Sequence, residues 1–563
     1  MNRTWQWSLG MTGMMALALT GCSTPAQPAA PGAPAAAASP AAATGPVTPK
    51  VNRVVMAIEP PARESNEVRN LSQPDIWPMK PMYEYLIGID PKNGKLVPEL
   101  ATEWALDAKT LAVSFKLRTG VPFQKGNGEF TSKDVQYSWQ DLVQQDSLHT
   151  QSPYFRTIIK SIEMPSPTQA VLNLSAPDGG FLRAISDGES NLEMSSKDHV
   201  AKKGASTLQT EPTVGTGAYQ YQGRSQGGYV RYERTPGKHW QVTPDFPEFE
   251  FRFVKEASTR LAALITGEIQ MTSLPQDLLT QAEGKGFKTV KGNVPGLRTF
   301  LSVKCCYIAD PKDHSKGMRY PESPLSDVRV RKALQKAINL DELNKGFFGG
   351  KGEVMINTHF HPTRDGRNPD WEKRFKDEYG YDPAAAKALL AQAGQPALET
   401  TFILGAGQSP GVQAADDIAE AIAGYWRTIG VKVNMMTLDS VAYDANARQQ
   451  KYSNHVQMGA TSSAQLFGSA VWNAAIGKSG AFPSVEDPEV DDTLNALYAT
   501  LEPAAQEPLF RKLGDLMYEK HMNLQLFWLP AQIIVDPKVV NDYVFPGSIS
   551  GLWTHIRNVK AAR

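Results

Sequence analysis

Three short motifs carry side chains that could perform chemistry, and the first would make the protein a hydrolase. Residues 407–411 read Gly-Gln-Ser-Pro-Gly and match the GxSxG pattern, in which a serine between a strand and a helix is the nucleophile. Asp439 and His455 follow Ser409 in the chain order of such enzymes. Pro410, however, lacks the backbone amide that the oxyanion hole needs from this position. A cell-envelope serine hydrolase using Ser409 therefore stays only as an alternative.

The second motif is the His-x-His pair formed by His359 and His361, with Asp310 and His314 earlier in the chain. Imidazoles bind transition metals in proteins. Neither spacing matches a zinc pattern with further cysteines or histidines. We therefore interpret the pair as part of a polar loop, and the sequence predicts no metal and no cofactor.

The third motif is the adjacent pair Cys305 and Cys306 at the end of a predicted strand. Their Cα atoms should lie about 3.8 Å apart, below the roughly 4.4 Å lower limit of ordinary disulfides. The spacing therefore favours buried thiols. A vicinal disulfide stays open as the rarer alternative if the chain is exported to an oxidising compartment.

The clearest element that could position these motifs lies in residues 110–143. Apolar and polar residues alternate through residues 110–118, as in a half-buried strand, and Gly120 ends the run. Thr131 and Asp134 then have the spacing of a capping box at the start of a helix. This strand, turn and helix organise a fold and perform no chemistry.

A second set of elements lies in the C-terminal half. Residues 400–404, 412–428 and 431–435 predict a strand, a helix and a strand, which is the order of a βαβ unit. Ser326 is expected to cap a helix with an apolar stripe. Strands alternating with helices place the chain in the α/β class.

The N-terminus has the features of an export signal. Arg3 precedes the apolar stretch 11–19, which is too short to span a bilayer. Small residues just before Cys22 resemble the lipobox, whose cysteine is acylated after export. We expect residues 1–21 to be a lipoprotein signal peptide and Cys22 to anchor the protein in a membrane through its acyl chains.

Composition bounds the remaining possibilities. The segment up to residue 50 is rich in Pro and Ala, so residues 22–50 should form an extended tether that buries no core. Lysine plus arginine equals aspartate plus glutamate at 58 each in a chain of 563 residues. Without a global field, a nucleic-acid partner is not expected. Internal repeats and coiled-coil heptads are also missing from the sequence, which weakens a third hypothesis, a non-catalytic envelope scaffold.

Two long runs resemble one known family. Residues 100–139 (LATEWALDAKTLAVSFKLRTGVPFQKGNGEFTSKDVQYSW) and residues 324–343 (PLSDVRVRKALQKAINLDEL) are similar to the family 5 extracellular solute-binding proteins of ABC importers. That family includes oligopeptide, dipeptide and nickel binders. The resemblance implies a protein that is not an enzyme: a solute is captured between two lobes and delivered to a membrane permease with its ATPase subunits.

The resemblance also implies an architecture. The expected fold is the two-lobed α/β periplasmic-binding-protein fold with an extra subdomain in the first lobe, facing the periplasm or cell exterior as a monomer. Strands near residues 299–303 and 526–530 should join the lobes. The implied division assigns lobe I to residues 51–90, 205–298 and 528–563, its extra subdomain to residues 91–204, and lobe II to residues 299–527.

Finally, the resemblance raises a question about the solute. Peptide binders of the family share a Trp and, three residues later, an Asp that pairs with the peptide's amino terminus. Here these positions fall near Ala460 and Ser463, and no acid lies between Asp444 and Glu486. An enclosed ammonium without a charge partner is costly, so we expect a neutral, blocked or non-peptide solute, with ordinary peptides as the alternative and Glu84 as a possible substitute acid. The candidate solute-binding residues are Trp77, Tyr154, Ser462, Ser463, Gln465 and Trp528.

Overall fold

The computed structural model describes residues 48–61, 63–71, 75–189, 191–362, 366–405, 412, 414–462, 484–545 and 555–562. Cys22, Ser409, Ser463 and Gln465 lie outside these residues. Residues 47–563 form one compact unit. Within the described part of the chain, no helix is both long enough and apolar enough to cross a membrane.

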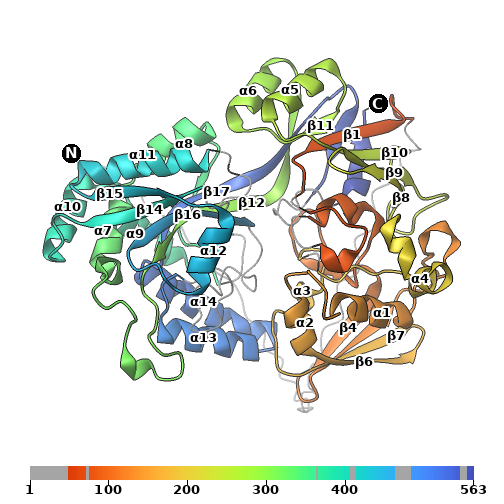
Figure 1. Cartoon of the computed structure of the whole chain (residues 1–563), viewed down its shortest axis with the longest axis horizontal. Helices are drawn as coiled ribbons and strands as arrows, with labels where there is room; N and C mark the ends of the chain where they lie inside the picture. The colour runs from red at the N-terminus through yellow and green to blue at the C-terminus, as the bar shows by residue number, and fades with distance from the viewer. Residues whose placement is uncertain are drawn as a thin grey trace, which may run out of the picture. The chain divides into compact units, whose positions relative to one another are not determined.

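A single mixed sheet of 11 strands runs through this unit. In spatial order its main path is β15 (Lys432–Thr437), β14 (Glu399–Leu404), β16 (His455–Ser462), β12 (Lys288–Lys304), β17 (Asn523–Val535), β11 (Met271–Thr272), β1 (Arg53–Ile58), β10 (Glu248–Phe253), β9 (Tyr229–Arg234) and β8 (Tyr219–Ser225). A short strand, β13 (Glu353–Val354), pairs with β17 off this path. Figure 1 shows these strands with the helices that cover them.

Two long strands, β12 and β17, are common to both parts of the sheet. Near its start β12 pairs with the end of β17, where Lys288 faces Val535. Further along, β12 lies between β17 and β16. The β12–β17 register shifts between Lys291 and Leu297 and again after Thr299, and such bulges bend a ladder locally. The strands expected to join the lobes, residues 299–303 and 526–530, lie inside β12 and β17.

We call the part on the β1 side of these strands the first lobe. Here β1 lies parallel to β10 and β11, and its residues are almost entirely buried because helices or loops cover both faces. Helices α5 (Ala257–Thr266) and α6 (Gln276–Gly284) pack with it. The C-terminal hairpin of β18 (Val540–Tyr543) and β19 (Val559–Ala561) contributes to the same core. The first lobe is therefore built from both ends of the described chain.

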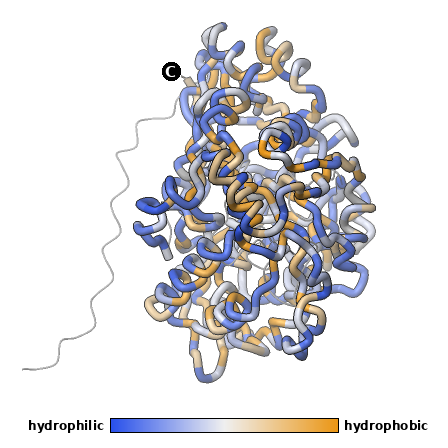
Figure 2. Tube along the Cα trace, turned by 90° about the vertical axis from the view of Figure 1, so that its left-hand side faces the viewer, coloured by the Kyte–Doolittle hydropathy of each residue, from blue (hydrophilic) through white to orange (hydrophobic). Residues whose placement is uncertain are grey.

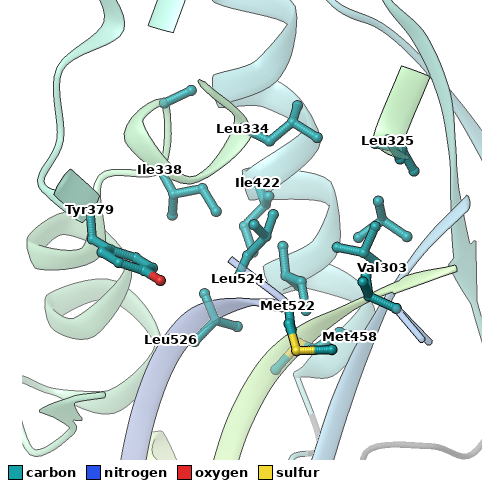
Figure 3. Packing of buried hydrophobic residues seen from close by; sticks show 14 of the residues in the cluster. Val303, Leu325, Leu334, Ile338, Tyr379, Ile422, Met458, Met522, Leu524 and Leu526 are labelled. Carbon is teal, nitrogen blue, oxygen red and sulfur yellow. The ribbon is translucent and has the colours of Figure 1, made fainter. Parts of the chain in front are cut away.

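The second lobe is the part on the β16 side, with its own hydrophobic core. Strands β14 and β15 are parallel, and helix α11 (Ala415–Thr428) connects them, so the predicted βαβ unit is confirmed. Figure 3 shows side chains such as Leu334, Ile422 and Leu524 meeting in this core. The remaining helices are α7 (Val328–Lys336), α8 (Leu340–Phe348), α9 (Pro369–Tyr379), α10 (Pro383–Gln392), α12 (Ser440–Arg448), α13 (Pro488–Ala499) and α14 (Pro503–Glu519).

A subdomain with a third core lies within the first-lobe sequence. It contains the four-stranded sheet β4 (Ala101–Asp107), β5 (Ala112–Leu117), β7 (Gln169–Leu174) and β6 (Ile159–Ser166). Its helices are α1 (Ser132–Leu142), α2 (Ser152–Ile158), α3 (Phe181–Ala184) and α4 (Lys197–Lys203), and the hairpin of β2 (Ile87–Ile89) and β3 (Leu96–Pro98) precedes the sheet. Hydrophobic and hydrophilic stretches alternate along the chain in Figure 2, as expected when each element has one buried face.

The strand and helix predicted in residues 110–143 are confirmed as β5 and α1. Thr131 and Asp134 form the expected capping box, with the Thr131 amide donating to Asp134 Oδ2 at 3.0 Å. Leu111 lies outside β5, because its φ of +58° places it in the turn before the strand. Alternation of residue types did not reveal this turn, since an apolar residue can occupy it.

The expected cap of helix α7 is wrong. Asp327, and not Ser326, caps α7, because its carboxylate accepts the Arg329 amide; the Ser326 hydroxyl instead donates to Ser323 O at 2.7 Å.

Cys305 and Cys306 form a vicinal disulfide, with Cα atoms 3.7 Å apart, so the expected free thiols are not found. The lower Cα limit used for that expectation describes cysteines from separate segments. Neighbouring cysteines instead close a small ring through their own peptide bond. Both residues are buried in the core of the second lobe.

Candidate functional site

The strands common to both lobes carry a row of polar and aromatic side chains. Trp528 on β17 lies opposite Arg298 on β12 and opposite Glu353 on β13. Directly opposed residues on neighbouring strands present their side chains on the same face of a sheet. Arg298 and Trp528 are each only 2% exposed, whereas the Glu353 side chain is 55% exposed. A cation, an indole and a carboxylate thus lie side by side beside the bulged stretch.

The His-x-His pair packs against this row. The Arg298 guanidinium donates to Nδ1 of His359, which must therefore be an acceptor, because arginine only donates. The His361 ring meets Trp528 edge to face, with centroids 5.3 Å apart, and its Nε2 lies 3.3 Å from Glu353 Oε2. We call Arg298, Glu353, His359, His361 and Trp528 the hinge row.

The loop that carries the two histidines is tied to the second lobe. Asn357 donates through Nδ2 to Gly514 O at 2.9 Å, and the Thr358 hydroxyl donates to Gln525 Oε1 at 2.6 Å. His359 has a φ of +79°, a left-handed conformation that is uncommon outside glycine. The loop is therefore buried and held in one conformation, and the interpretation of it as an ordinary polar loop missed this. Periodicity gave no sign of this packing, because His359 lies in a turn; the His-x-His spacing was the signal in the sequence.

The metal interpretation of these histidines gains no support. Among the described residues, no group of three or more His, Cys, Asp or Glu side chains is arranged to hold a metal ion.

A second group of charged side chains is enclosed in the first lobe and its subdomain. Lys80 Nζ lies 2.5 Å from Asp187 Oδ1, and His555 Nε2 lies 3.5 Å from Asp187 Oδ2. Arg557 lies 3.5 Å from Glu99 Oε1. Together these residues border a cavity of about 10 Å³, which has room for about one water molecule. We call this group of residues the ion-pair cluster. Its cavity is too small to hold a solute.

Electrostatics in the ion-pair cluster follow from its burial. Burial alone would raise the pKa of Asp187, but the charges of Lys80, His555 and Arg557 outweigh it and lower the value to about 2. Burial raises the pKa of Glu99 to about 8 despite Arg557, and burial lowers the pKa of His555 to about 4. The contacts of His555 with Asp187 and of Arg557 with Glu99 therefore hold the C-terminal segment on the lobe.

The substitute acid considered for an amino terminus, Glu84, is also enclosed. It is fully buried, and its Oε2 accepts hydrogen bonds from the Thr216 hydroxyl at 2.7 Å and Trp240 Nε1 at 3.0 Å. Burial raises its pKa to about 7, opposed by Arg557. In this structure Glu84 is an internal residue of the first lobe.

The sequence-predicted site residues do not form one group. Trp528 belongs to the hinge row, whereas Trp77, in a short 3₁₀ turn (Trp77–Met82), packs against the core of the first lobe. Tyr154 on α2 donates its hydroxyl to Asp178 Oδ2 at 2.7 Å within the subdomain. Ser462 is the last residue of β16. Arg298, missed by sequence reasoning, is adjacent to Trp528 because β12 and β17 are neighbours.

Glu189 in the subdomain is paired with Arg183. Its Oε1 lies 3.4 Å from Arg183 Nε. Burial raises the pKa of the Glu189 carboxyl, and the charges of Arg183, Lys80 and Arg298 act in the opposite direction.

Two α/β lobes joined by strands of one sheet, with buried polar and aromatic side chains on those strands, define a binding protein of the two-lobed class. The chain belongs to family 5 of the bacterial extracellular solute-binding proteins, whose sequence model matches residues 95–470. Proteins of this family serve ABC importers.

Individual relatives agree with this assignment. The chain is 26% identical to the dipeptide-binding protein of Escherichia coli K12, over 68% of this chain and 70% of that protein. It is 25% identical to the glutathione-binding protein GsiB of Salmonella typhimurium, over 84% and 86% of the two chains. NikA from Brucella suis, solved with Fe(III)-EDTA, superimposes with a TM-score of 0.73 at 17% identity, covering 90% of this chain and 99% of that one. The last similarity shows the fold alone.

Proposed function

We propose that this protein captures a small solute between its lobes, next to the hinge row, and passes it to a membrane permease without breaking a bond. The observation that carries the proposal is that β12 and β17 belong to both lobes and carry Arg298 and Trp528 between two shifts of their register. A solute that contacts these strands and both lobes stabilises the closed arrangement. In this proposal the lobes divide near residues 298 and 528.

The hinge row supplies one wall of the proposed site. Trp528 offers an apolar ring, while Arg298 and the two histidines can donate hydrogen bonds to oxygen atoms of a solute. The earlier candidates Trp77, Tyr154, Ser462, Ser463 and Gln465 remain proposals for its other walls. Solutes whose polar groups are left unpaired by these side chains would bind with lower affinity.

The proposed solute has no free ammonium group at the site. No acid lies between Asp444 and Glu486, and the alternative acid Glu84 already accepts two hydrogen bonds inside the first lobe. The Glu353 carboxylate of the hinge row faces His361. The dipeptide- and glutathione-binding relatives make ordinary peptides the alternative. Calorimetry with one peptide, free and N-acetylated, decides between them. Tight binding of the free form that acetylation weakens tenfold, about 1.4 kcal/mol, would exclude the proposal.

Thermal unfolding of the purified protein against a panel of peptides, sugars and metal complexes tests solute binding itself. A solute at a hundred times its Kd adds about 2.7 kcal/mol of stability. If no member of the panel stabilises the protein, while hydrolysis of an ester probe is lost in Ser409→Ala, the hydrolase alternative replaces binding.

The same proposal includes export as a monomeric lipoprotein. Residues 1–21 act as the signal peptide, Cys22 carries the acyl chains, and residues 22–50 tether the body to the membrane. Detergent-phase partitioning of Cys22→Ser tests the anchor. The variant should move to the aqueous phase, and unchanged partitioning would reject lipid anchoring.

A further inference from the structure

A loop of the subdomain touches the second lobe directly. The backbone amide of Gly179 donates to the carbonyl oxygen of Tyr498 at 3.0 Å. Gly179 lies just before α3, which packs into the subdomain core through Phe181, whereas Tyr498 lies in the last turn of α13, which packs into the second-lobe core through Leu497. The contact therefore joins two separate cores without using β12 or β17.

The two segments lie too close together for residue 179 to carry a side chain. A Cβ atom on Gly179 would lie 2.4 Å from Gln506 Nε2, 2.8 Å from Thr500 O and 3.3 Å from Leu497 O. Two of these atoms belong to the backbone and cannot rotate away. Gly179 does not have a positive φ, so an alanine would be accommodated by the loop itself. Only the presence of the second lobe excludes a side chain here.

The first-lobe side of the contact is shaped by Tyr154 and Asp178. The Tyr154 hydroxyl donates to Asp178 Oδ2 at 2.7 Å, and the Gly180 amide donates to Asp178 Oδ1 at 2.8 Å. Asp178 is only 8% exposed. These bonds fix the loop with the Gly179 amide available for Tyr498, which gives the Tyr154 hydroxyl a defined task inside the protein.

The second-lobe side is the carboxyl end of α13. The last carbonyls of a helix lack partners within it and carry partial negative charge. Here the Thr500 amide donates to Leu497 O, Gln506 Nε2 donates to Thr500 O at 2.6 Å, and Gly179 supplies the donor for Tyr498 O. The loop thus completes the cap of a helix in the other lobe. Figure 1 labels the helices that carry the two sides of this contact: α2 and α3 in the subdomain, and α13 and α14 in the second lobe.

We propose that residues 178–180 are a latch that fastens the subdomain to the end of α13 when the lobes close. The inference rests on the proposed function, because it assumes that the lobes open and close around a solute. Opening the lobes breaks the Gly179–Tyr498 hydrogen bond and exposes the end of α13. The latch therefore sets the ratio of closed to open protein and, through it, the apparent affinity for any solute that binds the closed form. Tyr154 is a positioning residue of this latch.

The test measures the distance between lobes directly and needs no solute. Nitroxide labels are placed on cysteines replacing Leu148 and Tyr381, which are 56% and 51% exposed in the subdomain and the second lobe. Cys22→Ser removes the remaining thiol, because Cys305 and Cys306 are bonded to each other and buried. Pulsed electron–electron double resonance on the full-length chain with these substitutions then gives the populations of short and long distances between the two labels.

We expect Gly179→Ala to lower the ratio of short to long distances at least tenfold. Gly223→Ala is the matched control, because a Cβ at Gly223 has no neighbour within 4 Å, and it should reproduce the wild-type distances. Tyr154→Phe, which keeps the ring, should shift the ratio in the same direction by a smaller factor. Circular dichroism confirms that each variant folds.

Distances in Gly179→Ala that match those of the wild type overturn the latch. So does a Gly179→Ala shift that Gly223→Ala shares. A protein that shows the expected shift but binds no member of the solute panel retains the latch and loses the proposed function. The two proposals can thus fail separately.

Discussion

The ion-pair cluster and the hinge row both contain arginine, histidine and carboxylate groups, yet they differ in burial and in how the charges are arranged. Asp187 and Glu99 are buried, whereas the Glu353 side chain is 55% exposed. In the ion-pair cluster, Lys80 faces Asp187 and Arg557 faces Glu99, and the groups surround a cavity of water size. In the hinge row, Arg298 contacts a neutral imidazole acceptor and lies beside an indole. Opposite charges that pair with one another hold segments of the chain together. A cation and hydrogen-bonding rings on strands common to two lobes are suited to recognition.

The largest effect should come from breaking the ion-pair cluster with Lys80→Met. This change leaves Asp187 buried without its nearest cation, and removal of one partner from a buried pair costs about 3–5 kcal/mol of unfolding free energy. Urea denaturation measures the loss. The control is Lys116→Met, because Lys116 and Glu103 form an exposed pair whose removal changes stability by less than about 1 kcal/mol. Equal effects of the two changes would contradict a structural role for the cluster.

Glu99→Gln should sharpen the comparison through pH. The pKa of Glu99 is about 8 in the folded protein against an ordinary 4.5, so between these values the folded state holds a proton that the unfolded state has released. Its contribution to stability is thus present below about pH 4.5 and is lost as pH rises toward 8. The glutamine variant should remove up to about 1.4 kcal/mol per pH unit of that slope. Denaturation at pH 5, 6 and 7 measures it, and an unchanged slope would count against a protonated Glu99.

The smallest change in stability is expected in the hinge row. His361→Phe keeps an aromatic ring against Trp528 and removes the nitrogen that faces Glu353. Unfolding free energy should change by less than about 1.5 kcal/mol, the usual net contribution of one hydrogen bond. Affinity for a solute found in the panel should fall about tenfold, or about 1.4 kcal/mol. Calorimetry compares the two proteins, and a loss of stability without a loss of affinity would make the row structural.

Local chemistry was enough to predict some elements and could not predict the contacts between lobes. Thr131 and Asp134 act within one helical turn, so their capping box is readable from spacing alone. Arg298 contacts His359 only after β12 and β17 have paired. Gly179 contacts Tyr498 only when the two lobes have come together. The disulfide of Cys305 and Cys306 was misjudged because a distance rule for separate segments was applied to neighbours.

The pairing of β12 with β17 also constrains the order in which the chain can fold. Lys288 pairs with Val535, and β11 of the first lobe also needs β17 as its neighbour. During synthesis the first lobe therefore remains an incomplete sheet until β17 has been made. Closing such long loops is entropically costly and slow. A chain in which both lobes depend on one late strand completes its fold late, which is compatible with the export of proteins of this family.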